Sequence, residues 1–239
     1  MRQFYPQEYW QDLIDWSTKY LQASINVICD IGCGNGNMIS IITKKFPHSK
    51  IIGVDLSEES LKYAKERFKS NINVEFKVGS IDSLPLPDGS LDMITCTEVL
   101  EHLDMDTLIN GFKEISRVLR KGGFLLASVP FEEKLTFVNC PECYCLFHPF
   151  QHMIFEISHE DIKTICEKNG MSVISFYQAY DRSIPSGSIA KKILKRFAMW
   201  LFPDYILAKF FPKAGATGFI ARKNSNINGG KLAWNTIIV

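Results

Sequence analysis

The sequence predicts a three-layer α/β fold, in which a parallel sheet lies between two layers of helices. Between residues 25 and 130, short apolar runs alternate with amphipathic segments. Apolar strands that are separated by helices are typical of a parallel sheet covered on both faces. The length of 239 residues, with 46% hydrophobic and 22% charged residues, suits one such domain with insertions and a large buried core.

Seven strands account for the apolar runs. In chain order we expect them at residues 25–31, 50–54, 73–78, 91–96, 124–129, 171–180 and 218–221. The first is a β-rich run that ends at Gly32. Each crossover between parallel neighbours is expected to be right-handed.

Four amphipathic segments predict helices, at residues 37–46, 57–70, 105–119 and 160–169. Pro47 stops the first, and glycines end the third and fourth, at Gly122-Gly123 and Gly170. The second begins at the capping residue Ser57, and its first turn is acidic, where the helix dipole favours negative charge.

Charge and cysteine content exclude several classes of protein. The 27 Lys and Arg residues nearly balance 26 Asp and Glu residues, and a chain that binds nucleic acid over its whole surface would be more basic. An odd number of cysteines, seven, does not suit a secreted disulfide framework. The first residues carry charges and lack the apolar core of a signal peptide, so we expect a cytoplasmic protein.

A glycine-rich turn follows the first strand and predicts a ligand site. It reads Asp30-Ile31-Gly32-Cys33-Gly34-Asn35-Gly36, and glycines let the backbone turn sharply and approach a ligand closely. The second strand ends at Asp55, and ligands of parallel sheets bind beyond the carboxyl ends of the strands. A carboxylate there can accept hydrogen bonds from both hydroxyls of a ribose.

Two cofactors use this arrangement. The dinucleotide fingerprint G-x-G-x-x-G would need a glycine at position 37, where this chain has Asn37. The pattern present, D-x-G-x-G-x-G, resembles the first motif of the class I S-adenosylmethionine (SAM) dependent methyltransferases. SAM carries an ammonium group, which suits the acid Asp30. The alternative interpretation of the same turn is that the chain is an NAD-dependent oxidoreductase.

The resemblance continues in order along residues 25–180. Residues 78–103 read VGSIDSLPLPDGSLDMITCTEVLEHL, and residues 117–130 read RVLRKGGFLLASVP, both similar to later motifs of the family. It implies a Rossmann-like, seven-stranded, mostly parallel sheet with an antiparallel last strand. It also implies cofactor contacts at Asp30, Gly32, Cys33, Gly34, Asn35, Gly36, Asn37, Asp55, Leu56, Ser80, Ile81, Asp82, Thr97 and Glu98.

One of these positions departs from the family pattern, and the resemblance also suggests how the chain is divided. Ser80 stands where members commonly have an acid beside the adenine, so we expect Asp82 to substitute for it. We expect residues 1–24 to form a helical segment over the cofactor site and residues 25–222 to form the methyltransferase domain. Insertions at 131–158 and 181–214 interrupt that domain, and residues 223–239 form a tail.

Methyl transfer from a sulfonium needs a positioned nucleophile and, for many acceptors, a base. His102 follows the fourth strand at the ligand edge and is the candidate base, with Glu98 four residues earlier to orient it. The alternative is that His102 only orders the loop and touches the cofactor. We expect a small acceptor, sugar-like, lipid-linked or a natural product, methylated on oxygen. An RNA methyltransferase and a non-catalytic SAM-binding protein are the alternatives.

A cysteine and histidine cluster lies in the first insertion. Cys140, Cys143, His148 and His152 follow the spacing C-x2-C-x4-H-x3-H, and two cysteines with two histidines can complete a tetrahedral zinc site. Two other readings stay open, a substrate lid without metal and a redox-active C-x-x-C pair. Structural zinc is therefore a hypothesis at this stage.

The second insertion is basic and aromatic. Residues 181–214 carry a net charge of +5 and six aromatic side chains. On a helical wheel, apolar and basic residues between 189 and 201 fall into opposite arcs, which suits peripheral membrane contact through residues 189–211. A lid or dimer helix, and a basic surface for RNA, are the other readings of this segment.

Overall fold

The computed structural model describes residues 7–21, 24–130, 138–139, 146–147, 157–180 and 214–224. Its helices are α1 Gln7–Ser17, α2 Asn37–Lys45, α3 Glu58–Arg67, α4 Met105–Val118 and α5 His159–Lys168, with short 3-10 turns η1 Thr18–Tyr20 and η2 Leu100–His102. Its strands are β1 Val27–Ile31, β2 Lys50–Asp55, β3 Val74–Val78, β4 Leu91–Thr97, β5 Leu119–Pro130, β6 Val138–Asn139, β7 Leu146–Phe147, β8 Met171–Tyr180 and β9 Ala214–Lys223.

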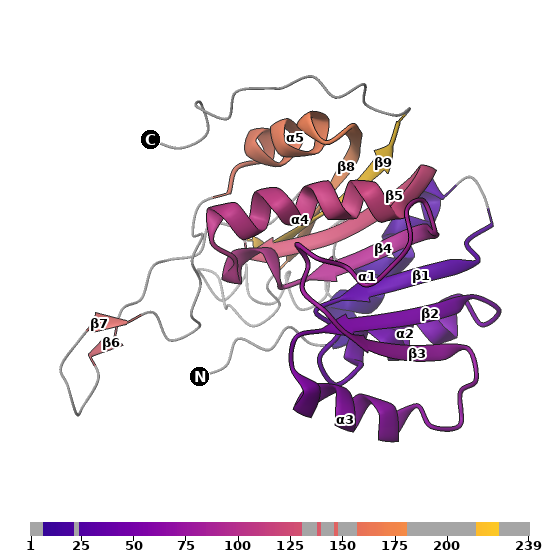
Figure 1. The fold of residues 1–239 in the computed structure, drawn as a ribbon. Coiled ribbons are helices and arrows are strands. Elements are labelled where there is room, and N and C mark those ends of the chain that lie inside the picture. The colour runs from indigo at the N-terminus through magenta and orange to yellow at the C-terminus, as the bar shows by residue number, and fades with distance from the viewer. Residues whose placement is uncertain are drawn as a thin grey trace, which may run out of the picture.

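The seven predicted strands form one sheet, and their order is β3-β2-β1-β4-β5-β9-β8 (Figure 1). Strands β1 to β5 pair in parallel, whereas β9 pairs antiparallel with both β5 and β8. The last strand is therefore antiparallel, which confirms that expectation. The short strands β6 and β7 form a separate two-stranded sheet inside the first insertion, which the sequence did not predict.

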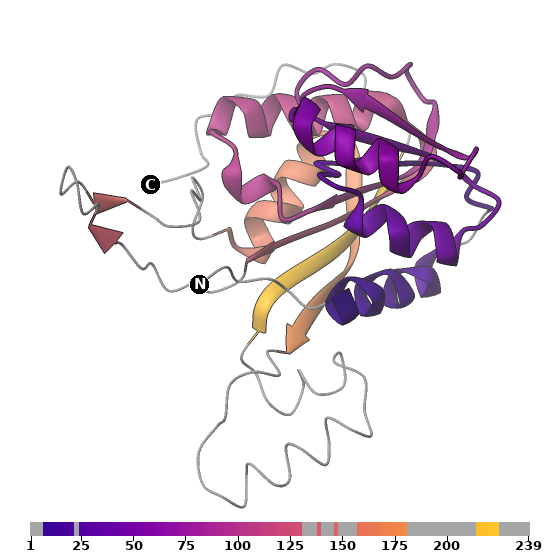
Figure 2. The ribbon, with the colours of Figure 1, turned by 90° about the horizontal axis from the view of Figure 1, so that it is seen from below.

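Two apolar cores cover the two faces of the sheet and make the three layers. Along β5, Leu125 packs toward α4 and α5, while Leu126 packs toward α1 and α2. Figure 2 shows α4 and α5 on one side of the strands and α1 on the other. This alternation follows from the two-residue period of a strand, which sends successive side chains to opposite faces.

Capping residues set the helix boundaries. The Ser57 hydroxyl accepts a hydrogen bond from the Ser60 N–H at 3.1 Å and caps α3, as predicted. Ser158 caps α5 and exchanges hydrogen bonds with Asp161 in a capping box. None of the helices within the described ranges is long and apolar enough to cross a membrane.

One boundary differs from the prediction. We expected the helix to end at residue 119 and the next strand to begin at residue 124; the helix ends at Val118, but β5 already begins at Leu119. Leu119 pairs with Leu91 of β4, and the register then shifts before Met93 pairs with Phe124. Tertiary pairing therefore draws this segment into the strand, and Gly122, with φ of 78°, absorbs the irregularity.

Helix α1, Gln7–Ser17, packs on the core of the domain. Tyr9, Leu13, Ile14 and Trp16 of α1 are buried in the core that α2 shares. A Cβ atom on Gly218 of β9 would lie 2.5 Å from Leu13, so the glycine lets α1 pack closely on the sheet. The position of this helix over the cofactor site stays a prediction.

Candidate active site at the carboxyl edge of the sheet

The glycine loop, residues 32–36, connects β1 to α2 at the carboxyl edge of the sheet. The N–H groups of Gly32 and Cys33 donate to the Val54 carbonyl of β2, at 2.8 and 3.1 Å. These hydrogen bonds fasten the start of the loop to the end of the neighbouring strand. As a result, the loop lies beside Asp55, as the sequence predicted.

The three loop glycines have positive φ but different surroundings. Gly32 and Gly36, with φ of 70° and 83°, lie against the side chains of Val99 and Phe68, so a Cβ atom would collide with them. Gly34, with φ of 49°, would direct its Cβ into open space, with no atom within 4 Å. Packing therefore requires two of the glycines, while the third leaves the backbone open to a ligand.

Asp55 is held in place by the backbone on both of its carboxylate oxygens. Oδ2 accepts a hydrogen bond from the Gly34 N–H at 2.7 Å, and Oδ1 accepts one from the Ser57 N–H at 2.8 Å. An ionised carboxylate has about four acceptor positions, so two hydroxyl groups can still bind. The side chain is preorganised and half-buried beside the open side of Gly34.

An apolar surface adjoins Asp55. Leu56, which the sequence analysis assigned to the cofactor, is 70% exposed, and Val78, which it missed, is 47% exposed. Val78 ends β3 and pairs with Asp55 across the sheet. Exposed aliphatic side chains at two neighbouring strand ends provide a surface for a flat apolar group such as a purine. The signal that could have found Val78 was its place as the last apolar residue of its strand.

Asp30 is a buried carboxylate with one oxygen left over. The residue is 1% exposed, and its Oδ1 accepts a hydrogen bond from Thr95 Oγ1 at 2.6 Å. Oδ2 accepts no hydrogen bond from any described residue. Burial raises the pKa of Asp30 to about 7; the Thr95 hydrogen bond opposes this shift, and the charge of Asp55 adds to it. A cationic ligand group would satisfy this oxygen and favour the ionised form.

The end of β4 carries backbone strain. Glu98 is the one non-glycine residue among those described with positive φ, at 55°. Its Oε1 accepts from Ser128 Oγ at 2.8 Å, and its N–H donates to the Ser128 carbonyl at 3.2 Å. These bonds to β5 hold Thr97 and Glu98 at the edge of the sheet. Strain that neighbouring contacts maintain is common at functional sites.

His102 lies in η2, directly after this strained turn. Its side chain is 43% exposed, and its Nε2 lies 4.0 Å from Oε1 of the buried Glu101. Glu101 therefore places a carboxylate beside the imidazole, and a carboxylate oxygen of Glu98 accepts from Ser128. The expected orientation of His102 by Glu98 stays a prediction.

The segment after β3 closes the other side of the site. Ser80 forms a bridge with Ser83, and Asp82 is half-buried. Ile81 is buried, and a Cβ atom on Gly111 of α4 would lie 3.0 Å from its side chain. The structure thus brings Ser80, Ile81 and Asp82 to the same edge as Asp55.

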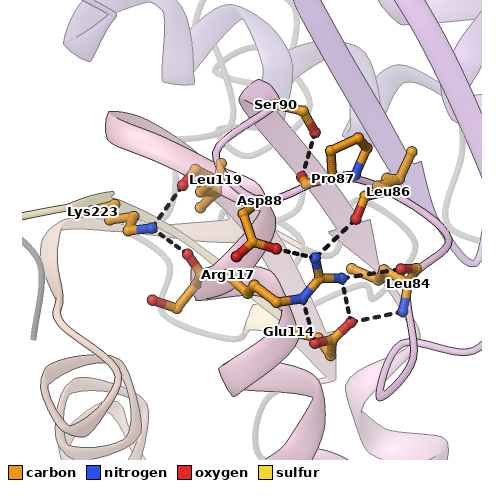
Figure 3. Close-up of polar contacts among 10 residues, drawn as sticks. Leu84, Leu86, Pro87, Asp88, Ser90, Glu114, Arg117, Leu119 and Lys223 are labelled. Carbon is orange, nitrogen blue, oxygen red and sulfur yellow. Dashed lines mark hydrogen bonds and ion pairs between the residues drawn. The ribbon is translucent and has the colours of Figure 1, made fainter. Parts of the chain in front are cut away.

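Arg117 of α4 anchors the rest of this segment (Figure 3). Its guanidinium donates to both oxygens of Glu114 at 2.7 Å, to Asp88 at 2.6 Å, and to the carbonyls of Leu84 and Leu86 at 3.1 and 2.9 Å. The hydrogen bonds to Arg117 lower the pKa of Glu114, whose carboxylate also accepts from the Leu84 N–H. In the sequence, this arginine is only one residue of a segment that resembles the family, and no local pattern indicates its contacts.

The residues that we predicted to bind zinc, and the basic segment, are outside the described residues. This applies to Cys140, Cys143, His148, His152 and residues 189–211. Within the described ranges, no group of three or more His, Cys, Asp or Glu side chains could hold a metal ion. The free cysteines Cys29, Cys33 and Cys96 are buried, and burial raises the pKa of each thiol.

Comparison with known proteins connects this geometry to a chemistry. Residues 28–123 match the model of a methyltransferase domain. YqeM of Bacillus subtilis, named as a methyltransferase, is 30% identical over 185 residues, which cover 70% of this chain and 69% of that protein. Demethylmenaquinone methyltransferase of Lactococcus lactis is 28% identical over 210 residues, covering 86% and 70%.

Solved structures agree on the fold. A SAM-dependent methyltransferase from Clostridium acetobutylicum superposes with a TM-score of 0.66 and 18% identity, covering 92% of this chain and 93% of that one. At this identity the likeness supports the architecture alone. The chain also spans less than half the length of three other curated relatives that it matches.

Proposed function

Because the chain belongs to the class I SAM-dependent methyltransferases, we propose that it transfers the methyl group of SAM to an oxygen atom of a small-molecule acceptor. The observation that carries the proposal is the hydrogen bond between Asp55 and Gly34 of the glycine loop, where the backbone is open to a ligand. At the same sheet edge, Asp30 has a carboxylate oxygen that accepts no hydrogen bond from a described residue. Together these residues offer acceptors for hydroxyls and for a cation at one edge of the sheet.

The residues present fit the cofactor. Asp55 would hold the ribose hydroxyls, and Leu56 with Val78 would face the adenine. The unfilled oxygen of Asp30 suits the ammonium of the methionine part. When bound, SAM supplies a methyl group on a sulfonium that needs no further activation. The protein therefore has to position the acceptor, exclude competing nucleophiles and remove a proton.

His102 is the proposed base on the acceptor side. Its imidazole is partly exposed, and the adjoining carboxylate of Glu101 would stabilise the imidazolium that forms when an acceptor hydroxyl loses its proton. Glu98 and Ser128 hold the strained turn that precedes His102. An acceptor whose hydroxyl has a high pKa needs such a base, which is why we place the methyl group on oxygen.

The names of two relatives agree with parts of this proposal. A protein from Marinomonas, 31% identical over 107 residues, is named as a malonyl-[acyl-carrier protein] O-methyltransferase. The Lactococcus relative is named for demethylmenaquinone, a small molecule, and its name does not say which atom is methylated. By contrast, a Thermosipho africanus relative, 31% identical over 117 residues, is named for ribosomal protein L11. The acceptor class therefore has to be tested directly.

A labelled-methyl screen tests the proposal. Cell extract is fractionated, incubated with the protein and methyl-labelled SAM, and treated with ribonuclease or protease in parallel. We expect label in small organic or lipid fractions, unaffected by either enzyme and absent with the Asp55→Ala variant. If ribonuclease or protease releases the label, the acceptor is RNA or protein, and the proposed small-molecule acceptor is wrong.

Two further parts of the proposal concern residues beyond those described. We propose that Cys140, Cys143, His148 and His152 bind a structural zinc ion, and metal analysis should then find about one zinc per chain, four ligands completing one tetrahedral site. We also propose that residues 189–211 contact anionic membranes. Vesicle flotation should then decline with added salt and with Trp200→Glu.

A further inference from the structure

We propose that Arg67 is a positioning residue for the cofactor site, which holds the glycine loop in its binding conformation through Asn35 and Asn37. The inference rests on the proposed function, since it concerns the affinity for SAM. Arg67 is the last residue of α3 and lies outside the motifs that predicted the cofactor site.

The contacts of Arg67 connect α3 to the loop and to the start of α2. Its Nη1 donates to the Asn37 side-chain Oδ1 at 2.8 Å and approaches the Asn35 carbonyl oxygen at 3.3 Å. Asn35 lies inside the loop, and Asn37 is the first residue of α2. One guanidinium therefore binds the loop and the helix that follows it.

Phe68, the next residue, supports the same loop from the core. A Cβ atom on Gly36 would lie 2.6 Å from its ring, so the ring occupies the space that a side chain at Gly36 would need. The Arg67 guanidinium carbon lies 5.5 Å from the centre of this ring. Hence Arg67 and Phe68 form a continuous support, one half through hydrogen bonds and the other through packing.

The support acts on the residues that face the ligand. Gly34, which donates to Asp55, is the direct neighbour of Asn35. A segment with three glycines has large conformational freedom, and binding a ligand requires that freedom to be lost. Contacts that order the loop beforehand reduce this cost and raise affinity. Because Arg67, Asn35 and Asn37 are exposed, they should affect loop order more than global stability.

The side chain at position 37 acquires a role in this arrangement. The dinucleotide fingerprint would place a glycine at this position, and a glycine has no side chain to accept a hydrogen bond. Asn37 supplies the Oδ1 atom that Arg67 binds. We therefore assign to Asn37 a positioning role, beside the cofactor contact that its place in the motif implies.

A double-mutant cycle in the full-length chain tests the proposal. The variants are Arg67→Met, which keeps the aliphatic stem over Phe68, Asn37→Ala, and the two combined. Lys65→Met is the matched control, because it removes an exposed charge from the same helix. Calorimetry with SAM gives the dissociation constant of each variant, and thermal unfolding without cofactor reports stability.

We expect Arg67→Met to raise the dissociation constant about 3- to 10-fold, the value of one modest hydrogen bond. Arg67→Lys should recover part of the affinity, and Lys65→Met should match the unmodified chain. In the Asn37→Ala background, Arg67→Met should have a smaller effect, since the shorter of the two hydrogen bonds is gone and only the 3.3 Å contact with the Asn35 carbonyl remains. The melting temperature without cofactor should barely change.

Two results would overturn the inference while leaving the function in place. One is SAM affinity within twofold of the unmodified chain for Arg67→Met, and the other is an equal loss of affinity in both backgrounds. If the unmodified chain fails to bind SAM, the proposed function itself is wrong, and the inference falls with it. The binding curve of the unmodified chain therefore separates the two failures.

Discussion

The carboxylate of Asp55, at the end of β2, accepts a hydrogen bond from the backbone N–H of Gly34, with 2.7 Å between Oδ2 and N. The two residues are 21 positions apart in the chain, and the parallel pairing of β1 with β2 brings them together. This contact orients the carboxylate before any ligand arrives. The same sheet edge holds Asp30 and the strained Glu98, so its residues form one site.

Asp30 should make both stability and cofactor affinity depend on pH. Its pKa in the folded protein is raised to about 7, so the folded state favours the protonated acid, and stability is lost as pH rises from about 4 through 7. The melting temperature without SAM should therefore fall more between pH 5 and 8 in the unmodified protein than in Asp30→Asn. A parallel pH dependence in both proteins would contradict the assignment.

The same residue should affect binding in the opposite direction. An ammonium group prefers the ionised carboxylate, so SAM affinity should weaken as pH falls below about 7, the pKa of Asp30. Calorimetry at pH 5.5 and pH 7 measures this change, because the ammonium group of SAM stays mostly protonated up to about pH 7. Asp30→Asn should bind SAM weakly at both values, and strong binding that is independent of pH in the unmodified protein would exclude the proposed contact.

Two alanine substitutions in the glycine loop should have different consequences. Gly36→Ala forces a Cβ against the Phe68 ring, so it should lower stability strongly. Gly34→Ala meets open space and should cost only about 1 to 2 kcal/mol for the left-handed backbone. We expect Gly34→Ala to reduce the free energy of SAM binding by more than it reduces the free energy of unfolding. If it binds SAM normally, the ligand does not approach the loop at Gly34.

Arg117 should matter for stability, because it holds the segment that follows β3. Replacing it by alanine removes the guanidinium donor from Glu114 and from the Leu84 and Leu86 carbonyls. Glu114 then keeps the Leu84 N–H as a donor, and the Leu84 carbonyl keeps the Leu86 N–H. The expected loss is about 2 to 4 kcal/mol in the free energy of unfolding, measured with urea. Lys113→Ala on the same helix is the control and should change it by less than about 0.5 kcal/mol.

His102 should affect turnover and leave cofactor binding intact. His102→Asn removes the proposed base, and the rate with an identified oxygen acceptor should fall on the order of 100-fold or more. The dissociation constant for SAM should stay within about twofold, a difference below 1 kcal/mol. An unchanged rate would assign His102 to loop order, and a lost SAM affinity would assign it to the cofactor.

The sequence predicted the strands and helices well, because they depend on local patterns. Apolar periodicity located the seven strands, and Ser57 marked the start of α3 by its capping chemistry. The predicted start of β5 was wrong, because the pairing of Leu119 with β4 outweighed the local glycine signal. Tertiary context decides such boundaries.

The candidate site was predictable where a motif lies on one loop or strand end. Asp30, Asp55 and the glycines converge as expected. Val78 and Arg67 were missed, because their roles arise from contacts between distant segments. Arg67 reaches Asn37 across 30 positions, and no local pattern records such a pair.

Cofactor binding to the unmodified chain tests the central claim most directly. Calorimetry should show one SAM bound per chain, no binding of NAD, and a loss of SAM affinity of about 100-fold or more in Asp55→Ala, because two hydrogen bonds to a charged group are removed. Asp55→Asn keeps one acceptor oxygen, so its affinity for SAM should lie between those of the unmodified chain and Asp55→Ala. Binding of NAD in place of SAM, or unchanged SAM affinity in Asp55→Ala, would contradict the account.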